Sequence, residues 1–337
     1  MSNRFIISSS DVFCRTAGVF RLILTAWLIM TVGLFISCGG GKSDSPQDDF
    51  NADFRFLVIS DTHVRLPGNA DSIDYNAQRN LDNLAHIINR INTDFSTADF
   101  VAVTGDMVGC LFSENPDDYG IGMDTTAERY KSMIDTLSMP VYSTFGNHDY
   151  QKSYDPVLHE GVSSQNRDAI EAVWKKVLGM EPYYSIVNKG VRMVFANSNR
   201  GDAYNDVCPT CTVEMGCTGS FDAGQIAWLR AELANPEPAI IFIHHPPVTD
   251  NQFIIYFALP SFLIENGDEF YNVVEDNQDK ILAIFVGHGH VWAYDTLGSV
   301  RVYETGATGD GSSSGNNINI VEVNTAGRKI KVTNVKQ

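Results

Sequence analysis

The chain has 337 residues, 44% of them hydrophobic, and a formal net charge of −17. This length allows one or two domains with a large buried core. The acidic excess argues against tight binding of a nucleic-acid polymer, because such a protein cannot neutralise many phosphates with Lys or Arg. An anionic substrate would need a local positive centre, which bound metal ions can supply.

The amino-terminal residues predict export. Residues 22–37 are uncharged and mostly apolar and follow Arg15 and Arg21. This run is short for a membrane-spanning helix and fits the apolar part of a secretory signal, with an amino-terminal membrane anchor as the alternative. It ends in Ser37-Cys38-Gly39-Gly40, which resembles a bacterial lipoprotein processing site. The resemblance implies a membrane anchor through a lipid on Cys38, in the bacterial cell envelope (periplasm or outer surface).

Three segments are expected. Residues 1–37 form the lipoprotein-type signal segment, and residues 38–52, which are polar and acidic, form a flexible tether. The rest contains no internal repeat and no linker, so residues 53–337 are expected to form one catalytic domain.

Four cysteines lie outside the targeting segment: Cys110, Cys208, Cys211 and Cys217. In an exported protein they favour disulfides, whose pairing the sequence does not determine. A zinc site in the cluster CPTCTVEMGC is the alternative, but the cluster offers only three thiolates and no adjacent His.

Strands alternate with helices in the first half of the expected domain. This order predicts a parallel sheet covered by helices, with ligands outside the carboxyl ends of the strands. The strands are predicted at 54–60, 99–104 and 140–145, and the helices at 81–95, 127–137 and 168–178.

The second half adds a hairpin and an antiparallel tail. The hairpin strands are predicted at 183–187 and 191–196. A helix at 222–233 and strands at 239–243 and 281–286 follow, and the tail strands lie near 291–294, 300–303, 318–323 and 329–335.

Five of these apolar strands are followed within two residues by Asp, Asn or His, which would place these side chains along one edge of a parallel sheet. Carboxylate and imidazole together suit a first-row divalent metal, whereas a calcium site would be nearly all oxygen. Seven candidate ligands suit two metals that share a ligand. The seven are Asp61, His63, Asp106, Asn147, His244, His288 and His290, and His148 directly follows Asn147.

The order Asp-x-His, Gly-Asp, Gly-Asn-His-Asp, His, Gly-His-x-His resembles the calcineurin-like metallophosphoesterase family, over residues 54 to about 305. The resemblance implies an α/β fold of two packed mixed β-sheets flanked by helices, with the metal site at the carboxyl ends of the strands. It also implies two divalent metal ions, which are Mn, Zn, Fe or Mg. By resemblance, Asp61, His63 and His290 bind one metal, Asn147, His244 and His288 bind the other, and Asp106 bridges them.

Two such cations lower the pKa of a shared water and yield hydroxide near neutral pH. The expected activity is hydrolysis of small phosphate mono- or diesters. His148 is expected to protonate the leaving oxygen or to stabilise charge on the reacting group. Asp149 is expected to orient that imidazole, with a surface cap on the next helix as the alternative. His245 is the alternative to His244 as ligand, or else lies behind the ligands or on the rim.

The chain departs from one branch of the family, and two alternative functions stay open. The purple acid phosphatase branch has a Tyr three residues after the bridging Asp, and Gly109 stands there in this chain, so an iron–tyrosinate site is not expected. A cyclic-nucleotide-type or other phosphodiesterase is the alternative enzyme, and a non-catalytic metal-containing binding lipoprotein is the alternative outside catalysis. The substrate, selected by the loops 111–126, 197–219 and 248–268, and the oligomeric state stay undetermined.

Overall fold

The computed structural model describes residues 50–65, 77–110, 126–155, 160–163, 167–202, 218–251, 262–265, 267–309 and 317–336. The chain divides into the units Met1–Asp49 and Phe50–Gln337, and all described residues belong to the second. The expected signal segment, most of the tether, and Cys208, Cys211 and Cys217 lie outside the described residues. Export, lipidation, domain bounds and disulfide pairing therefore stay predictions. Cys110 is buried.

The first sheet has five strands in the order β13-β12-β1-β2-β3. The strands β1, β2 and β3 are parallel to one another, and β12 and β13 extend the sheet with antiparallel pairings. The bounds are β1 Phe54–Ile59, β2 Val101–Val103, β3 Val141–Ser143, β12 Asn317–Asn324 and β13 Lys329–Lys336.

The second sheet has six strands in the order β10-β11-β9-β8-β7-β6. Its four central strands are parallel, and β6 and β10 are antiparallel edges. The bounds are β6 Tyr184–Asn188, β7 Val191–Phe195, β8 Ala239–Phe242, β9 Ile281–Val286, β10 Ala293–Leu297 and β11 Val300–Glu304. A separate hairpin that the sequence did not predict comprises β4 Gln151–Asp155 and β5 Glu160–Ser163.

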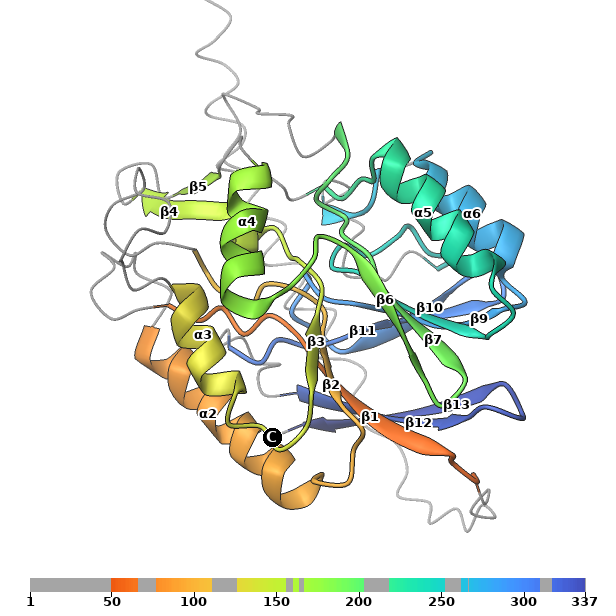
Figure 1. Cartoon of the computed structure of the whole chain (residues 1–337), viewed down its shortest axis with the longest axis horizontal. Helices are drawn as coiled ribbons and strands as arrows, with labels where there is room; N and C mark the ends of the chain where they lie inside the picture. The colour runs from red at the N-terminus through yellow and green to blue at the C-terminus, as the bar shows by residue number, and fades with distance from the viewer. Residues whose placement is uncertain are drawn as a thin grey trace, which may run out of the picture. The chain divides into compact units, whose positions relative to one another are not determined.

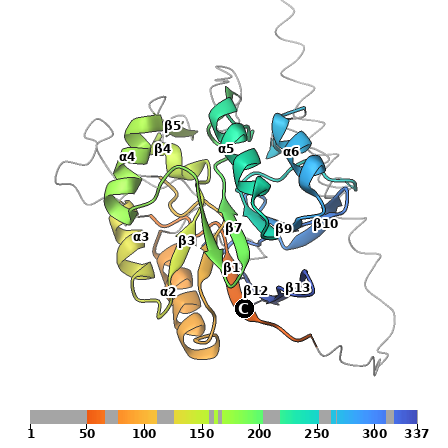
Figure 2. The ribbon, with the colours of Figure 1, turned by 45° about the vertical axis from the view of Figure 1, so that its right-hand side comes forward.

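Helices cover the outer faces of both sheets (Figures 1 and 2). The helices α2, α3 and α4 pack on the first sheet, and α5 and α6 pack on the second. The side chains of Asp222 and Asp268 cap α5 and α6 by accepting hydrogen bonds from backbone N–H groups of the first turn. The bounds are α2 Ala77–Asp94, α3 Thr126–Ile134, α4 Arg167–Leu178, α5 Ala223–Ala234 and α6 Glu269–Asn277.

An aromatic core joins the two sheets. Along β1, Phe54, Phe56 and Val58 face the other sheet, whereas Leu57 and Ile59 face the helices, as the twofold period of a strand requires. The Phe56 ring meets the rings of Phe242 and Phe285 edge-on, with centroids 5.9 and 6.1 Å apart. The loss of a side chain this deeply buried costs about 3–5 kcal/mol. The expected fold class, two mixed sheets flanked by helices, is confirmed.

The prediction that all five polar strand ends lie on one sheet was wrong. The strands β1, β2 and β3 belong to one sheet and β8 and β9 to the other. Apolar periodicity shows that a strand is buried and does not show which strand it pairs with. Within the described residues, no helix is long and apolar enough to cross a membrane.

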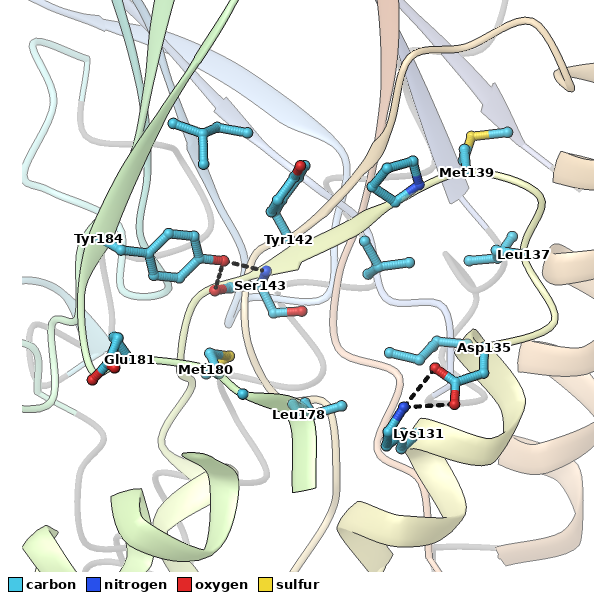
Figure 3. Close-up of a pocket in the computed structure, with 15 residues that line it drawn as sticks. Lys131, Asp135, Leu137, Met139, Tyr142, Ser143, Leu178, Met180, Glu181 and Tyr184 are labelled. Atoms are coloured by element: carbon cyan, nitrogen blue, oxygen red, sulfur yellow. Dashed lines mark hydrogen bonds and ion pairs between the residues drawn. The ribbon is translucent and has the colours of Figure 1, made fainter. Parts of the chain in front are cut away.

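The edges of the two sheets are tied together by one tyrosine. The backbone N–H of Ser143 in β3 donates to the hydroxyl of Tyr184 in β6, and that hydroxyl donates to the Ser143 carbonyl, both at 2.9 Å (Figure 3). The backbone N–H and carbonyl of Ser143 point away from β2. The hydrogen bonds to β2 are made by other residues of this segment, namely the Pro140 carbonyl and the Thr144 N–H. The Tyr184 hydroxyl therefore occupies the place of a further strand and blocks the edge of β3. It lines a cavity of about 550 Å³ whose walls also carry Met139, Leu178 and Met180.

We expect Tyr184→Phe to lower the free energy of unfolding by about 1–3 kcal/mol, because it leaves the largely buried amide and carbonyl of Ser143 without this partner. Urea denaturation measures the change. Tyr294→Phe is the matched control, since Tyr294 is 60% exposed, and it should change stability by less than about 0.5 kcal/mol. Equal stability of the two variants would contradict the edge-blocking role.

Candidate metal centre

The carboxyl ends of five strands from the two sheets converge on one buried cluster. Three of these strands, β1, β2 and β3, belong to the first sheet, and β8 and β9 belong to the second. Each strand end carries polar residues that the sequence singled out. Two sets of ligand atoms lie within 4.8 Å of one another, and Asp106 belongs to both. The first set is Asp61, His63, Asp106 and His290, and the second is Asp106, His244 and His288.

In the first set, two imidazoles face two carboxylates. The Nε2 atoms of His63 and His290 are 3.1 Å apart. His290 Nε2 lies 3.3 Å from Asp61 Oδ1, and His63 Nε2 lies 3.6 Å from Asp106 Oδ2. Four potential ligand atoms therefore surround one point.

In the second set, His244 is the centre. Its Nε2 lies 3.1 Å from Asn147 Oδ1, 3.1 Å from His288 Nδ1 and 3.3 Å from Asp106 Oδ2. Its Nδ1 lies 2.8 Å from the Thr104 carbonyl and donates to it. A neutral His244 would then point the Nε2 lone pair at two oxygens, which is unfavourable unless a positive charge lies between them. Burial alone would lower the pKa of His244, but the Asp106 carboxylate outweighs burial and raises it to about 9.

The charges of the other groups suit metal ligation. Burial would raise the pKa of Asp106, yet the imidazoles of His244 and His148 hold it well below its usual range. Burial and the adjacent His148 lower the pKa of His63, and burial and the adjacent His245 lower that of His288. Carboxylate and neutral imidazole are the forms that bind a metal.

The spacing and chemistry of the cluster fit divalent cations. Metal–ligand bonds of about 2.0–2.2 Å place neighbouring ligand atoms about 3–3.6 Å apart, which is the spacing seen here. Three oxygens and four imidazoles suit first-row metals. Buried polar atoms without a hydrogen-bond partner among the described residues also border the cluster, namely His63 Nδ1, Asn147 Nδ2 and His288 Nε2.

The backbone is strained where the candidate ligands lie. Seven described non-glycine residues have positive φ, and five of them are in the cluster. A left-handed conformation costs such a residue about 1–2 kcal/mol, and strain of this kind concentrates at functional sites. The five are Asp61 (φ 50°), His63 (43°), Asp106 (51°), His288 (76°) and His290 (59°).

Gly146 is required for a reason the sequence did not reveal. A Cβ at this position would lie 2.1 Å from Asp106 Oδ1, so only glycine lets the end of β3 approach the shared carboxylate. The same oxygen accepts the backbone N–H of His148 at 2.9 Å. The end of β3 thus holds Asp106 in place.

His148 and Asp149 lie beside the cluster, in the short 3₁₀ helix His148–Tyr150. His148 Nδ1 is 3.1 Å from the Gly109 carbonyl, and its ring meets the His63 ring edge-on at 4.6 Å. The carboxylate of Asp149 accepts the backbone N–H groups of Gly146 at 2.8 Å and Val108 at 3.1 Å.

Asp149 is fully buried, so the alternative of a surface cap is wrong. Its two oxygens hold the loops after β2 and β3 together. The group that lies at His148 Nδ1, where Asp149 was expected, is the Gly109 carbonyl. Burial and then the Asp106 charge raise the pKa of Asp149 to about 8.

The structure brings His244, and not His245, into the cluster; His245 Nδ1 instead lies 2.7 Å from Ser198 Oγ. Sequence reasoning missed Ser198, although Asn197-Ser198 follows the apolar strand β7 as the other polar groups follow theirs. Most of the three expected substrate-selecting loops lies outside the described residues.

Comparisons with known proteins agree with this architecture. A family model described as calcineurin-like phosphoesterase matches residues 54–292. A dimetal phosphatase from Danio rerio is structurally similar, with a TM-score of 0.55 and 14% identity, over 85% of this chain and 97% of that one. A purple acid phosphatase from yellow lupin (Lupinus luteus) seeds has a TM-score of 0.52 and 11% identity, over 84% of this chain and 51% of that one.

Comparison with curated proteins found no match. The two structural similarities show the fold, and the family model covers most of the domain. The chain therefore belongs to the calcineurin-like phosphoesterase family, whose members are phosphoric ester hydrolases with a dinuclear divalent metal site.

Proposed function

We propose that the protein hydrolyses small phosphate mono- or diesters outside the cytoplasm, at a dinuclear centre built from the seven converging residues. The observation that carries the proposal is the Asp106 carboxylate shared by two sets of ligand atoms. One cation would be held by Asp61, His63 and His290, and the other by Asn147, His244 and His288. Two bound cations supply an activated water and offset charge on the phosphoryl oxygens.

His148 is proposed as the general acid. The Gly109 carbonyl lies 3.1 Å from its Nδ1, so Nε2 is the nitrogen that would face the substrate. From there it would protonate the leaving oxygen. Asp149 is proposed to act indirectly, since it holds the loops that carry Asp106 and His148.

The metal identity stays open among Mn, Zn, Fe and Mg. A tyrosinate ligand at position 109 is not supported, because this residue is glycine. The site also has no room for a side chain, since a Cβ there would lie 2.1 Å from the buried Arg65 Nε. The resemblance of Ser37-Cys38-Gly39-Gly40 to a lipoprotein processing site supports attachment to the bacterial envelope through Cys38.

Purified protein should hydrolyse nitrophenyl phosphate or bis-nitrophenyl phosphate when Mn²⁺ is added, and chelation by EDTA should abolish turnover. A panel of mono- and diesters, including cyclic nucleotides, measures the preference, and elemental analysis of the same sample should give two metals per chain. Bound metal with no turnover of any ester would instead support the binding-lipoprotein alternative.

His148→Ala should lower kcat by about 10²–10⁴-fold and retain both metals, because a general acid is lost and no ligand is. The loss should be larger for an alkyl ester than for a nitrophenyl ester, whose leaving group needs no protonation. Asn147→Ala should lower both the metal content and the activity. His86→Ala, on the exposed face of α2, is the matched control. Full activity of the His148 and Asn147 variants would refute the proposed roles.

Cys38→Ser should move the protein from the membrane fraction to the soluble fraction, because the lipidated side chain is removed. Immunoblotting of fractionated cells measures the distribution. Retention of the variant in the membrane fraction would favour an uncleaved spanning segment at residues 22–37.

A further inference from the structure

His245 follows a candidate ligand but has a different environment. Its side chain is fully buried, and its Nδ1 lies 2.7 Å from Ser198 Oγ. The backbone N–H of His245 also donates to this oxygen, at 3.2 Å. One hydroxyl group therefore holds both the ring and the backbone of residue 245.

Ser198 is itself held by regular structure. Its carbonyl accepts the N–H of Ser220 at 2.8 Å. The preceding residue, Asn197, exchanges two hydrogen bonds with Gln225 of α5, at 2.6 and 2.8 Å. On the far side, Gly219 packs so closely that a Cβ there would lie 2.6 Å from His245 Cβ. The His245 side chain thus has little freedom to move.

The His245 ring packs against His288. The two ring centroids are 4.7 Å apart, and Phe262 packs on His288 with a centroid distance of 4.9 Å. His288 Nδ1 lies 3.1 Å from His244 Nε2. The ring plane of His288 is therefore fixed by its aromatic neighbours.

His288 and His244 differ in what their second ring nitrogen contacts. A metal-ligating histidine ordinarily donates its second ring nitrogen to a carbonyl or carboxylate, which sets its orientation. His244 does so with the Thr104 carbonyl, but His288 Nε2 has no hydrogen-bond partner among the described residues. Among the described residues, the rings of His245 and Phe262 pack on His288 and orient it.

We propose that His245, held by Ser198, is a positioning residue that keeps His288 Nδ1 turned toward the second metal position. The inference rests on the proposed role of His288 as a ligand of that metal. It goes beyond the ligand set, since neither Ser198 nor His245 would touch the metal or the substrate.

Calorimetric titration of the metal-free full-length protein with Mn²⁺ tests this inference without substrate. In Ser198→Ala and His245→Ala, one of two Mn²⁺ equivalents should bind about 10–100-fold more weakly, and the other should bind as in the wild type. The Mn²⁺ concentration for half-maximal activity should rise in parallel, with kcat recovering at saturating Mn²⁺. Unchanged affinity of both equivalents in both variants would overturn the proposal.

Further variants separate positioning from general damage. Ser185→Ala removes a hydroxyl that bonds to Glu232 in the last turn of α5 and should leave both Mn²⁺ affinities unchanged. His245→Phe keeps a ring against His288, so its loss should be smaller than that of His245→Ala. Loss of both equivalents together with a lower melting temperature would show a general packing role and refute positioning. A wild-type protein that binds fewer than two equivalents would contradict the dinuclear centre and this inference with it.

Discussion

The Asp106 carboxylate is the group on which the rest of the centre depends. It lies at the end of β2, and its Oδ2 faces imidazoles from both sets of ligands, at 3.6 Å from His63 and 3.3 Å from His244. Its Oδ1 accepts the amide of His148. So many buried polar groups at such short distances are stable only with positive charge among them. The fold therefore concentrates negative and neutral ligands where two cations would compensate them.

Backbone hydrogen bonds beyond the strand ends hold the strained ligands. The amides of Asp61 and His63 donate to the carbonyls of Gly105 and Asp106, at 3.1 and 3.0 Å, and Gly287 donates to the His244 carbonyl at 3.0 Å. Each such bond contributes about 0.5–1.5 kcal/mol, which is comparable to the cost of one left-handed residue. The ladders of both sheets thus continue into the loops that carry the ligands, which keeps the site rigid.

The histidines of the centre are oriented by different devices. Thr104 and Gly109 carbonyls orient His244 and His148 through their Nδ1 atoms, whereas aromatic packing holds His288. A carbonyl fixes the ring and the site of its proton, but packing fixes only the ring plane. The orientation of His288 therefore depends on residues that touch neither metal nor substrate.

The sequence by itself determined the types and positions of the chemical groups. Apolar strands followed by Asp61, Asp106, Asn147 or His244 are local patterns, and the residue types a metal requires are visible one position at a time. Only the tertiary structure decided how the strands divide between two sheets, why Gly146 must be glycine, and that Asp149 clamps backbone amides. It also decided that Ser198 and Tyr184 tie distant segments together. These features depend on contacts between residues tens to hundreds of positions apart, and neither periodicity nor residue type encodes such distances.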